Sequence, residues 1–466
     1  MASMAAGCWL PVTVSNWSER WVGADSTRAL RLGVLVGLVV TVWAIRPLWD
    51  IDLFWHVAIG RVVLESGLPR TDVFSAANPA AEWHTFQWAY EVLVAAVDRV
   101  AGLRGLQLLH ASVIGLAFGG LATAVCRWKG WLGALTVCAV GLLLFEDRVR
   151  ERPHVFELLF VVGLLPVVLE RVRVHGAVLV AVGVVWANLH AVSALWWFAL
   201  VGAWALRSPR RLGWVAAGGL AMAAISPVRN GLWGALGSHS SWPSELVPEL
   251  QGTLAYAEQG WWGVIVLSVV AMGLFASFRV PKEERLIAVG CAVAACLMAR
   301  WAWFAAIPLG LYLARLPPRV HAGTLSVVLV LLGARAGARW PLDVRFGEVL
   351  QPGTFPVQAC EAASGLPVGT DTYTQWSGYW LYCNPGSTVL GDGRLVFGED
   401  VVDLLLRRTE GDVHTFDEAV GTWHTLALVW PTATAPPLAE ERWRVVHQDE
   451  VATVWVASPG WGLLEP

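Results

Sequence analysis

Apolar runs separated by short polar connections fill most of the chain before residue 340. A helix that crosses a membrane needs about 20 consecutive, mostly apolar residues, and somewhat fewer when neighbouring helices shield its ends. The pattern predicts about eleven such helices. They cover residues 30–46, 105–126, 131–145, 155–170, 175–189, 192–206, 213–226, 261–278, 285–299, 301–314 and 321–337. We therefore expect an α-helical polytopic membrane protein.

One further apolar run, residues 86–102, carries charged side chains, which are costly in the hydrocarbon core of a bilayer. Its polar and small residues recur at three- and four-residue steps, at Gln87, Glu91, Ala95, Asp98 and Gly102. This spacing gives a helix one polar or small face. We therefore predict a juxtamembrane helix that lies along the outer surface and does not span.

Basic residues orient the spans. If residues 86–102 do not span, the Lys and Arg residues of alternate connections fall on one side, which the positive-inside rule makes cytoplasmic. These residues are Arg20, Arg28, Arg31, Arg127, Lys129, Arg171, Arg173, Arg207, Arg210, Arg211, Arg279, Lys282, Arg285, Arg315 and Arg319. Residues 1–28 then form a cytoplasmic segment, and outer loop 1 (47–104) lies on the opposite side. In the inner (plasma) membrane of a bacterium, that side is the periplasm or the cell exterior.

Composition divides the chain near residue 340. The whole chain is 56% hydrophobic and 15% charged, whereas soluble domains carry about 25% charged residues. The shortage of charge lies before residue 340, which excludes a soluble globular protein for the chain as a whole. We therefore predict a transmembrane domain over 29–339 and a soluble, extracytoplasmic domain over 340–466. The sequence contains no feature that indicates a nucleic-acid partner.

Residues 340–466 are expected to form a small α/β domain. Alternating patterns predict a strand and turn over 372–381, a strand over 425–430, and a hairpin whose strands cover 443–447 and 451–456. A tight Asp-Gly turn is expected at residues 392–393. Two cysteines of this domain, Cys360 and Cys383, form either a disulfide, which an oxidising compartment permits, or two buried thiols.

Acidic residues gather where the first span leaves the membrane. Asp50 lies at this exit, and Asp52 can cap a helix that begins near it. His56 lies four residues after Asp52 and therefore shares its helix face. This pair could supply two ligands to a divalent cation, with a third from another Asp or Glu. The alternative is an amphipathic helix with an ordinary acidic first turn.

Three arginines of the next outer connection, Arg148, Arg150 and Arg152, break the positive-inside trend. Outward-facing arginines need a counter-charge. A phosphate ligand could supply it, because the guanidinium fork matches phosphate oxygens. The alternative is a self-neutralised cluster with the acidic residues of the same connection, which are Glu146, Asp147 and Glu151.

Other polar residues lie at the predicted outer edge of the membrane. Asn188 and His190 end one span, Arg229 follows another, and Arg300 joins two. A histidine at the end of a span is more often packed or snorkelling than catalytic. These residues matter only together, since each outer end brings polar groups to one rim.

The order of these features resembles the GT-C glycosyltransferase superfamily. That group includes protein mannosyltransferases, oligosaccharyltransferases and aminoarabinose transferases. In detail the chain also looks like a widespread family of bacterial polytopic membrane proteins. The matching residues are Asp50, Asp52, Trp55, His56, Gly60, Pro69, Asp72, Phe74, Ser75, Trp83, Arg152, Pro153, Trp186, Asn188, His190, Pro227, Trp376, Gly378, Tyr379, Asp392, Gly393 and Arg394.

The chain departs from the better-known members of the superfamily. Mannosyl- and aminoarabinose transferases usually carry Asp-Glu where this chain has Asp50-Ile-Asp52, and a nearby Lys-Pro-Pro-Leu that is absent here. The oligosaccharyltransferase Trp-Trp-Asp signature is absent too. The acceptor therefore does not follow from the resemblance, because a shared fold does not determine activity.

The resemblance implies transfer of a sugar from a polyprenyl-phosphate donor to an acceptor at the outer face of the inner membrane, by direct inverting displacement. Asp50 is the expected general base. The other expected roles are acceptor orientation or cation binding by Asp52, His56 and Glu91, phosphate binding by Arg148, Arg150 and Arg152, and support by His84, Asn188, His190, Arg229 and Arg300.

Two other functions stay open. One is a non-catalytic membrane component of envelope polysaccharide or glycoconjugate assembly that uses the outer domain to bind partners. The other is a transporter or flippase, which would place ionisable residues at mid-bilayer and show repeated halves. The sequence shows neither of these two features.

Overall fold

The computed structural model describes residues 26–79, 81–83, 85–191, 194–225, 317–339, 342–363, 369–392 and 398–458, with a few positions between 285 and 296. The predicted spans at 261–278 and 301–314 lie outside these residues, and so does most of the span at 285–299. Of the candidate site residues, His84, Arg229 and Arg300 also lie outside them.

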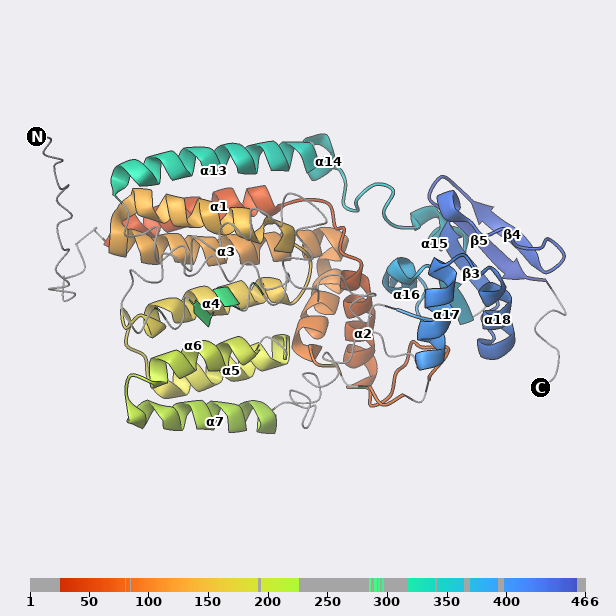
Figure 1. The fold of residues 1–466 in the computed structure, drawn as a ribbon, viewed down its shortest axis with the longest axis horizontal. Helices are drawn as coiled ribbons and strands as arrows, with labels where there is room; N and C mark the ends of the chain where they lie inside the picture. The colour runs from red at the N-terminus through yellow and green to blue at the C-terminus, as the bar shows by residue number, and fades with distance from the viewer. Residues whose placement is uncertain are drawn as a thin grey trace, which may run out of the picture.

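The described part is mostly helical, and its long helices lie side by side with a small domain beyond one end (Figure 1). The helices of this layer are α1 (Ser26–Ala44), α3 (Trp88–Phe145), α4 (His154–Val168), α5 (Gly176–Leu189), α6 (Ala194–Ala205), α7 (Pro209–Ile225) and α13 (Pro318–Arg339). Three described helices, α1, α3 and most of α13, are long and apolar enough to cross a membrane. The total of about eleven spans stays a prediction.

Two glycines divide α3 into three segments. Gly102 and Gly130 have φ values of 60° and 79° and interrupt the helical backbone. Residues with a Cβ rarely adopt this conformation, so glycine is required at both breaks. The segment before Gly102 corresponds to the separate helix predicted over 86–102. It runs with α2 (Asp52–Ser66) across the end of the helix layer, next to the C-terminal domain (Figure 1).

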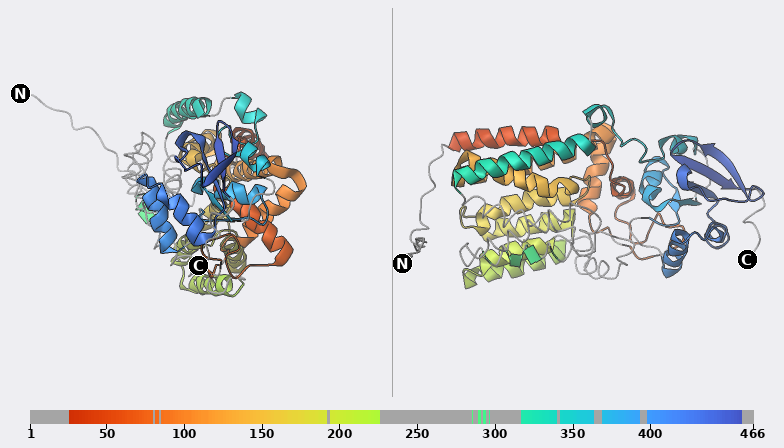
Figure 2. Two further views of the ribbon diagram at one scale, coloured as in Figure 1. Left: turned by 90° about the vertical axis from the view of Figure 1, so that its right-hand side faces the viewer. Right: turned by 45° about the horizontal axis from the view of Figure 1, so that its top comes forward.

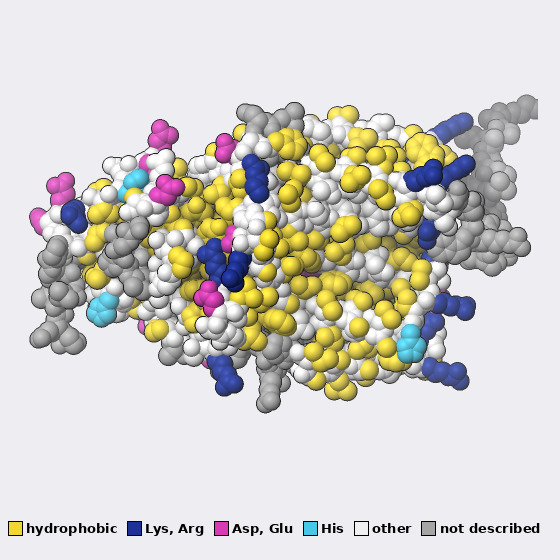
Figure 3. All heavy atoms as spheres, turned by 180° about the vertical axis from the view of Figure 1, so that it is seen from behind, with side chains coloured by type: hydrophobic (Ala, Val, Ile, Leu, Met, Phe, Trp, Pro, Cys, Tyr) yellow, Lys and Arg dark blue, Asp and Glu magenta, His cyan; other side chains and the backbone are white. Residues whose placement is uncertain are grey.

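The basic connections lie together. The start of α1, the turn between the second and third segments of α3, and the links from α4 to α5 and from α6 to α7 all lie at the end of the layer away from the C-terminal domain (Figures 1 and 2). The space-filling view shows Lys and Arg side chains along that end (Figure 3). The sequence prediction put these connections on one side of the membrane. Which side is cytoplasmic stays a prediction.

Helix α2 is packed between the first segment of α3 and the C-terminal domain. A Cβ on Gly60 would lie 2.0 Å from the Glu91 carbonyl oxygen and 2.7 Å from Ala95 Cβ, so only glycine permits this approach. Asp98 binds the Arg61 guanidinium at 2.8 Å. The polar or small face predicted for residues 86–102 therefore packs on α2.

The C-terminal domain has the predicted α/β character. Its five strands are β1 (Gly369–Thr372), β2 (Thr388–Val389), β3 (Ala427–Pro431), β4 (Trp443–Gln448) and β5 (Ala452–Ala457). They form one sheet in the order β2-β1-β3-β5-β4, parallel among β1, β2 and β3 and antiparallel among β3, β4 and β5. The predicted strand near 425–430 and the hairpin of the last two strands are confirmed.

Helices and short 3-10 turns complete this domain. They are α14 (Leu342–Gly347), α15 (Val357–Ala362), η4 (Thr374–Trp376), α16 (Ser377–Cys383), α17 (Glu399–Thr409), α18 (His414–Trp423) and η5 (Thr432–Thr434). The predicted strand over 372–381 is wrong, because β1 ends at Thr372 and α16 follows. A Cβ on Gly378 would lie 2.9 Å from the Ile51 carbonyl oxygen, so α16 packs directly on the start of α2. Tertiary packing here overrides the strand preference of the aromatic run.

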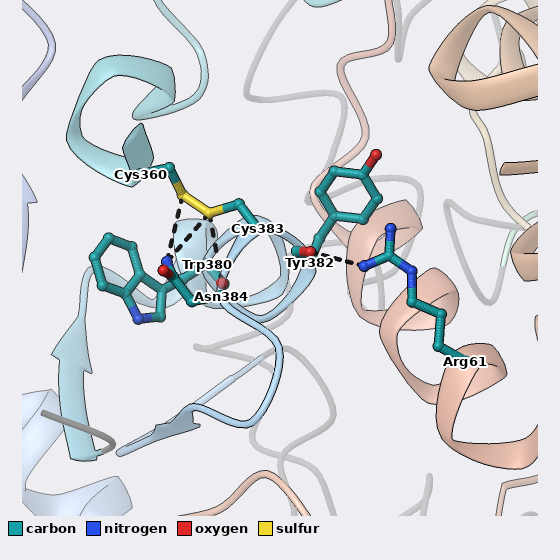
Figure 4. The surroundings of a disulfide bond; sticks show 6 residues. All are labelled: Arg61, Cys360, Trp380, Tyr382, Cys383 and Asn384. Atoms are coloured by element: carbon teal, nitrogen blue, oxygen red, sulfur yellow. Dashed lines mark hydrogen bonds between the residues drawn. A yellow bond between two sulfur atoms is a disulfide. The ribbon is translucent and has the colours of Figure 1, made fainter. Parts of the chain in front are cut away.

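A disulfide joins Cys360 and Cys383 and so decides between the two alternatives for these cysteines (Figure 4). It ties α15 to the last residue of α16, with the two Cα atoms 6.2 Å apart. Next to it, Arg61 of α2 donates a hydrogen bond to the Tyr382 carbonyl oxygen (2.8 Å). Helix α16 is therefore held covalently on one side and by an α2 arginine on the other.

Candidate functional site

The site is built on the turn between α1 and α2. Asp50 lies two residues before α2, and its Oδ1 accepts a hydrogen bond from the Asp52 backbone N–H (2.9 Å). The N-cap residue is Ile51, which has no capping side chain. The expectation that Asp52 caps the helix is therefore wrong, since Asp50 satisfies the exposed N–H and Asp52 is the first helical residue.

The second outer connection brings two of its arginines to these aspartates. Arg152 Nε lies 2.6 Å from Asp50 Oδ2, and Arg152 Nη2 lies 3.0 Å from Asp52 Oδ2. Arg150 Nη1 lies 3.9 Å from Asp50 Oδ2. We call Asp50, Asp52, Arg150 and Arg152 the Asp–Arg cluster. Two arginines thus converge on the Asp50 carboxylate, and Arg152 lies 102 positions from Asp50 in the chain.

Burial is graded across the Asp–Arg cluster. The Asp50 side chain is 1% exposed, whereas those of Arg152 and Asp52 are 18% and 19% exposed. Arg150 also lies over the Trp49 ring, with its guanidinium carbon 4.5 Å from the ring centroid. Stacking and ion pairing together restrict the guanidinium planes. The cluster therefore has a buried carboxylate at its base and partly exposed cationic groups at its edge.

The acidic residues of the arginine connection have other surroundings. Glu146 pairs with Arg46 (3.5 Å) and with Arg335 of α13 (2.5 Å). The Glu151 carboxyl group is buried, and its Oε2 has no hydrogen-bond partner among the residues that the structure describes. Burial raises the pKa of Glu151 to about 7. Among the described residues, Asp50 and Asp52 of outer loop 1 therefore supply carboxylates to Arg150 and Arg152.

Arg148, the third predicted phosphate ligand, ends the 3-10 helix η1 (Glu146–Arg148). Its backbone carbonyl oxygen accepts a hydrogen bond from His154 Nε2 (2.8 Å). This contact links η1 to the first residue of α4.

His56 and Glu91 form a buried pair between α2 and the first segment of α3. His56 Nδ1 is 3.4 Å from Glu91 Oε1, and the Thr85 hydroxyl donates to the other Glu91 oxygen. Both side chains are buried, and burial, with a smaller contribution from Arg152, lowers the pKa of His56 well below its usual value. A neutral imidazole then joins α2 to the first segment of α3, in agreement with the close approach at Gly60.

A metal held by Asp52 and His56 stays a prediction. Among the described residues, no three His, Cys, Asp or Glu side chains gather closely enough to hold an ion. In this structure Asp52 pairs with Arg152, and His56 pairs with Glu91.

The ends of α4 and α5 carry a second set of polar contacts. Trp88 Nε1 donates to Asn188 Oδ1 (2.7 Å), and the Asn188 amide donates to the Val184 carbonyl oxygen (2.8 Å). His190 Nδ1 binds the carboxylate of Glu157, a residue in the first turn of α4. Sequence reasoning did not assign Glu157 or Trp88 to the site, because neither belongs to a motif that shows its partner.

Comparisons with known proteins bear on the fold. No known family profile and no curated protein sequence matches the chain. Two crystal structures of ArnT from Cupriavidus metallidurans are similar over 93% of this chain and 99% of theirs. The one bound to undecaprenyl phosphate has 14% identity and a TM-score of 0.51, and the one in the apo state has 15% and 0.53.

Similarity at such low identity concerns the fold alone. It agrees with the resemblance that the Asp motif and the order of the spans indicated. The chain therefore resembles the GT-C glycosyltransferases, and the aminoarabinose transferase ArnT among them, in its fold.

Proposed function

We propose that the protein is a GT-C-type glycosyltransferase that moves a sugar from a polyprenyl-phosphate donor to an acceptor at the outer face of the inner membrane. The observation that carries this proposal is the convergence of Asp50 and Asp52 with Arg150 and Arg152. The fold supports it, because one ArnT structure of similar fold is bound to undecaprenyl phosphate.

The arginines are the proposed phosphate ligands. Guanidinium groups bind phosphate through paired N–H donors, and their charge stabilises a departing phosphate. Arg150 and Arg152 are partly exposed and already oriented by the aspartates and Trp49. A phosphate at this edge would meet two positive charges without rearrangement of the backbone. Arg148 is a proposed third ligand.

The proposed reaction is one displacement. The acceptor hydroxyl oxygen forms a bond to the anomeric carbon while the bond from that carbon to the phosphate oxygen breaks. The polyprenyl phosphate leaves with the electron pair of the broken bond, and the hydroxyl proton passes to the Asp50 carboxylate. Attack opposite the leaving group inverts the anomeric centre. Asp52, His56 and Glu91 are proposed to position the acceptor or a divalent cation.

The disulfide and the charge distribution support an outer location for the site. Disulfides persist in oxidising compartments such as the periplasm, and the Cys360–Cys383 disulfide lies in the domain next to α2. The basic connections lie at the opposite end of the helix layer (Figure 3), which the positive-inside rule makes cytoplasmic.

Undecaprenyl phosphate binding tests the proposal. The full-length protein is placed in phosphatidylcholine nanodiscs and titrated with undecaprenyl phosphate. Arg152→Gln is expected to weaken binding at least about tenfold, the effect of losing about 1.4 kcal/mol. Arg210→Gln makes the same change at an exposed position in the first turn of α7, on the basic end, and serves as the matched control. Equal affinities of the two variants would contradict the proposed phosphate site.

Complementation separates an enzyme from a non-catalytic assembly component. A strain that lacks the protein receives either the wild type or Asp50→Asn, and its envelope glycans are analysed. If the protein is an enzyme, Asp50→Asn should not restore the envelope glycans, although the variant is present at a normal level and still binds undecaprenyl phosphate. Full restoration would favour the non-catalytic component.

A further inference from the structure

Two carboxylates engage one edge of the Arg152 guanidinium. Its Nε contacts Asp50 at 2.6 Å, and its Nη2 contacts Asp52 at 3.0 Å. A guanidinium group binds an oxyanion most strongly when two parallel N–H groups reach two oxygens. In the Asp–Arg cluster, each aspartate uses one of the two donors. A phosphate that takes this edge therefore has to displace an aspartate oxygen.

Asp50 is held at both of its carboxylate oxygens. Oδ1 accepts the Asp52 backbone N–H, and Oδ2 lies between Arg152 and Arg150. A general base has to come within hydrogen-bond reach of the proton that it removes. Loosening the contact between Oδ2 and Arg152 therefore frees a lone pair of Oδ2 for the hydroxyl proton.

We propose that the donor phosphate and Asp50 compete for Arg152, so that phosphate binding releases Asp50 Oδ2 for the acceptor hydroxyl. The inference rests on the proposed function and adds an order to it, with the donor binding before the acceptor is deprotonated. The phosphate takes the Arg152 Nε–H that Asp50 gives up, and Oδ2 then takes the acceptor proton as the sugar–phosphate bond breaks. The positive charge of Arg152 is paired throughout.

Burial distinguishes Asp50 from Asp52 in this exchange. The Asp52 side chain is 19% exposed, so water can replace Arg152 as its partner. The Asp50 side chain is 1% exposed, and a buried carboxylate that loses its cation is left with an uncompensated charge. Asp50 is therefore the stronger competitor for Arg152, and its release is tied to an incoming hydrogen-bond donor such as the acceptor hydroxyl.

Charge removal at each aspartate tests the competition. Wild type, Asp50→Asn and the matched control Asp52→Asn are titrated with undecaprenyl phosphate in phosphatidylcholine nanodiscs. The amide oxygen of Asn can still accept the Asp52 backbone N–H, so the start of α2 is retained. Asp50→Asn is expected to tighten binding about tenfold. Asp52→Asn is expected to tighten it at most about threefold, as for an exposed ion pair.

The outcomes separate this inference from the function beneath it. If wild type does not bind undecaprenyl phosphate, the proposed function and the competition both fail. If wild type binds and Arg152→Gln weakens binding, but Asp50→Asn leaves affinity unchanged or lowers it, only the competition fails. Equal tightening by the two Asn variants would mark a general charge effect and also overturn it. If Asp50→Asn unfolds, Asp50→Ser replaces it, because a serine hydroxyl can accept the same N–H.

Discussion

Two sets of Asp–Arg ion pairs in this molecule differ in geometry and burial. In the C-terminal domain, Arg408 binds both oxygens of Asp371, at 2.9 and 2.5 Å, and also donates to the Thr415 carbonyl oxygen. Both side chains are buried, with exposures of 4% and 3%, and the guanidinium carbon lies 4.3 Å from the centre of the Phe416 ring. In the Asp–Arg cluster, Arg152 divides its contacts between two carboxylates and is partly exposed.

The difference shows what separates a structural ion pair from one that can exchange partners. A bidentate buried pair has its donors engaged and is shielded from solvent, so it holds α17 to β1. A divided pair at an edge makes one contact to each partner, is partly exposed and can accept a third anion. The same two residue types therefore support different roles, and geometry and burial decide between them.

The sharpest test of this contrast is Asp371→Asn. It leaves the buried Arg408 without a counter-charge, which costs about 3–5 kcal/mol. Asp52→Asn removes a partly exposed partner of Arg152 and should cost less than about 1 kcal/mol. Denaturant unfolding of the full-length protein in detergent, followed by limited proteolysis, measures both. Similar losses of stability for the two variants would contradict the distinction between the buried bidentate pair and the partly exposed divided pair.

The Cys360–Cys383 disulfide is expected to support the Asp–Arg cluster through α16. Cys360 and Cys383 are 23 positions apart, and a cross-link over such a loop contributes about 3 kcal/mol. The double variant Cys360→Ser/Cys383→Ser should lower the stability of the C-terminal domain by that amount. Because α16 packs on the start of α2, undecaprenyl phosphate affinity should fall too. Unchanged affinity with lower stability would show that α16 does not position the Asp–Arg cluster.

Glu151, which lies between Arg150 and Arg152 in the chain, is expected to make the stability of the protein depend on pH. Burial raises the pKa of Glu151 from 4.5 to about 7 in the folded protein. Its contribution to stability is therefore fully present below pH 4.5 and is lost as the pH rises through about 7. The loss is at most about 3 kcal/mol. The stability of wild type minus that of Glu151→Gln should fall between pH 5 and pH 8, and a constant difference would show that Glu151 is not a buried neutral acid.

Arg152→Lys is the most conservative change to the cluster. Lysine keeps the positive charge but cannot present two parallel N–H donors, so it cannot bridge Asp50 and Asp52 as arginine does. We expect an affinity loss for undecaprenyl phosphate of about 1 kcal/mol, smaller than for Arg152→Gln. Isothermal titration compares the two variants. Equal losses would show that the fork geometry, and not the charge alone, is essential.

Much of the fold could be predicted because it depends on local patterns. The apolar runs at α1 and α13 are long enough to read directly, and the polar face at 86–102 indicated a separate helix. Gly102 ends that helix in the structure, at the last residue of the predicted face. The β4–β5 hairpin was readable from two alternating runs with a polar turn between them.

Other features were not readable because their cause lies elsewhere in the chain. The run 372–381 has aromatic residues typical of a strand, yet Ser377–Cys383 is helical where it packs on α2. Asp52 looked like the helix cap, but backbone geometry gives that contact to Asp50. The sequence offered Glu146, Asp147 and Glu151 as counter-charges for the arginines, but spacing along the chain could not show that Asp50 and Asp52 pair with Arg150 and Arg152.

The sequence by itself determined the apolar character of the spans, the clustering of basic connections and the residue types available for phosphate chemistry. These follow from hydrophobicity and charge, which act residue by residue. Only the tertiary structure decided that Arg152 divides its contacts between Asp50 and Asp52, with a span of 102 positions between Asp50 and Arg152. Ion pairs depend on distance and burial in three dimensions, and neither quantity is encoded in spacing along the chain.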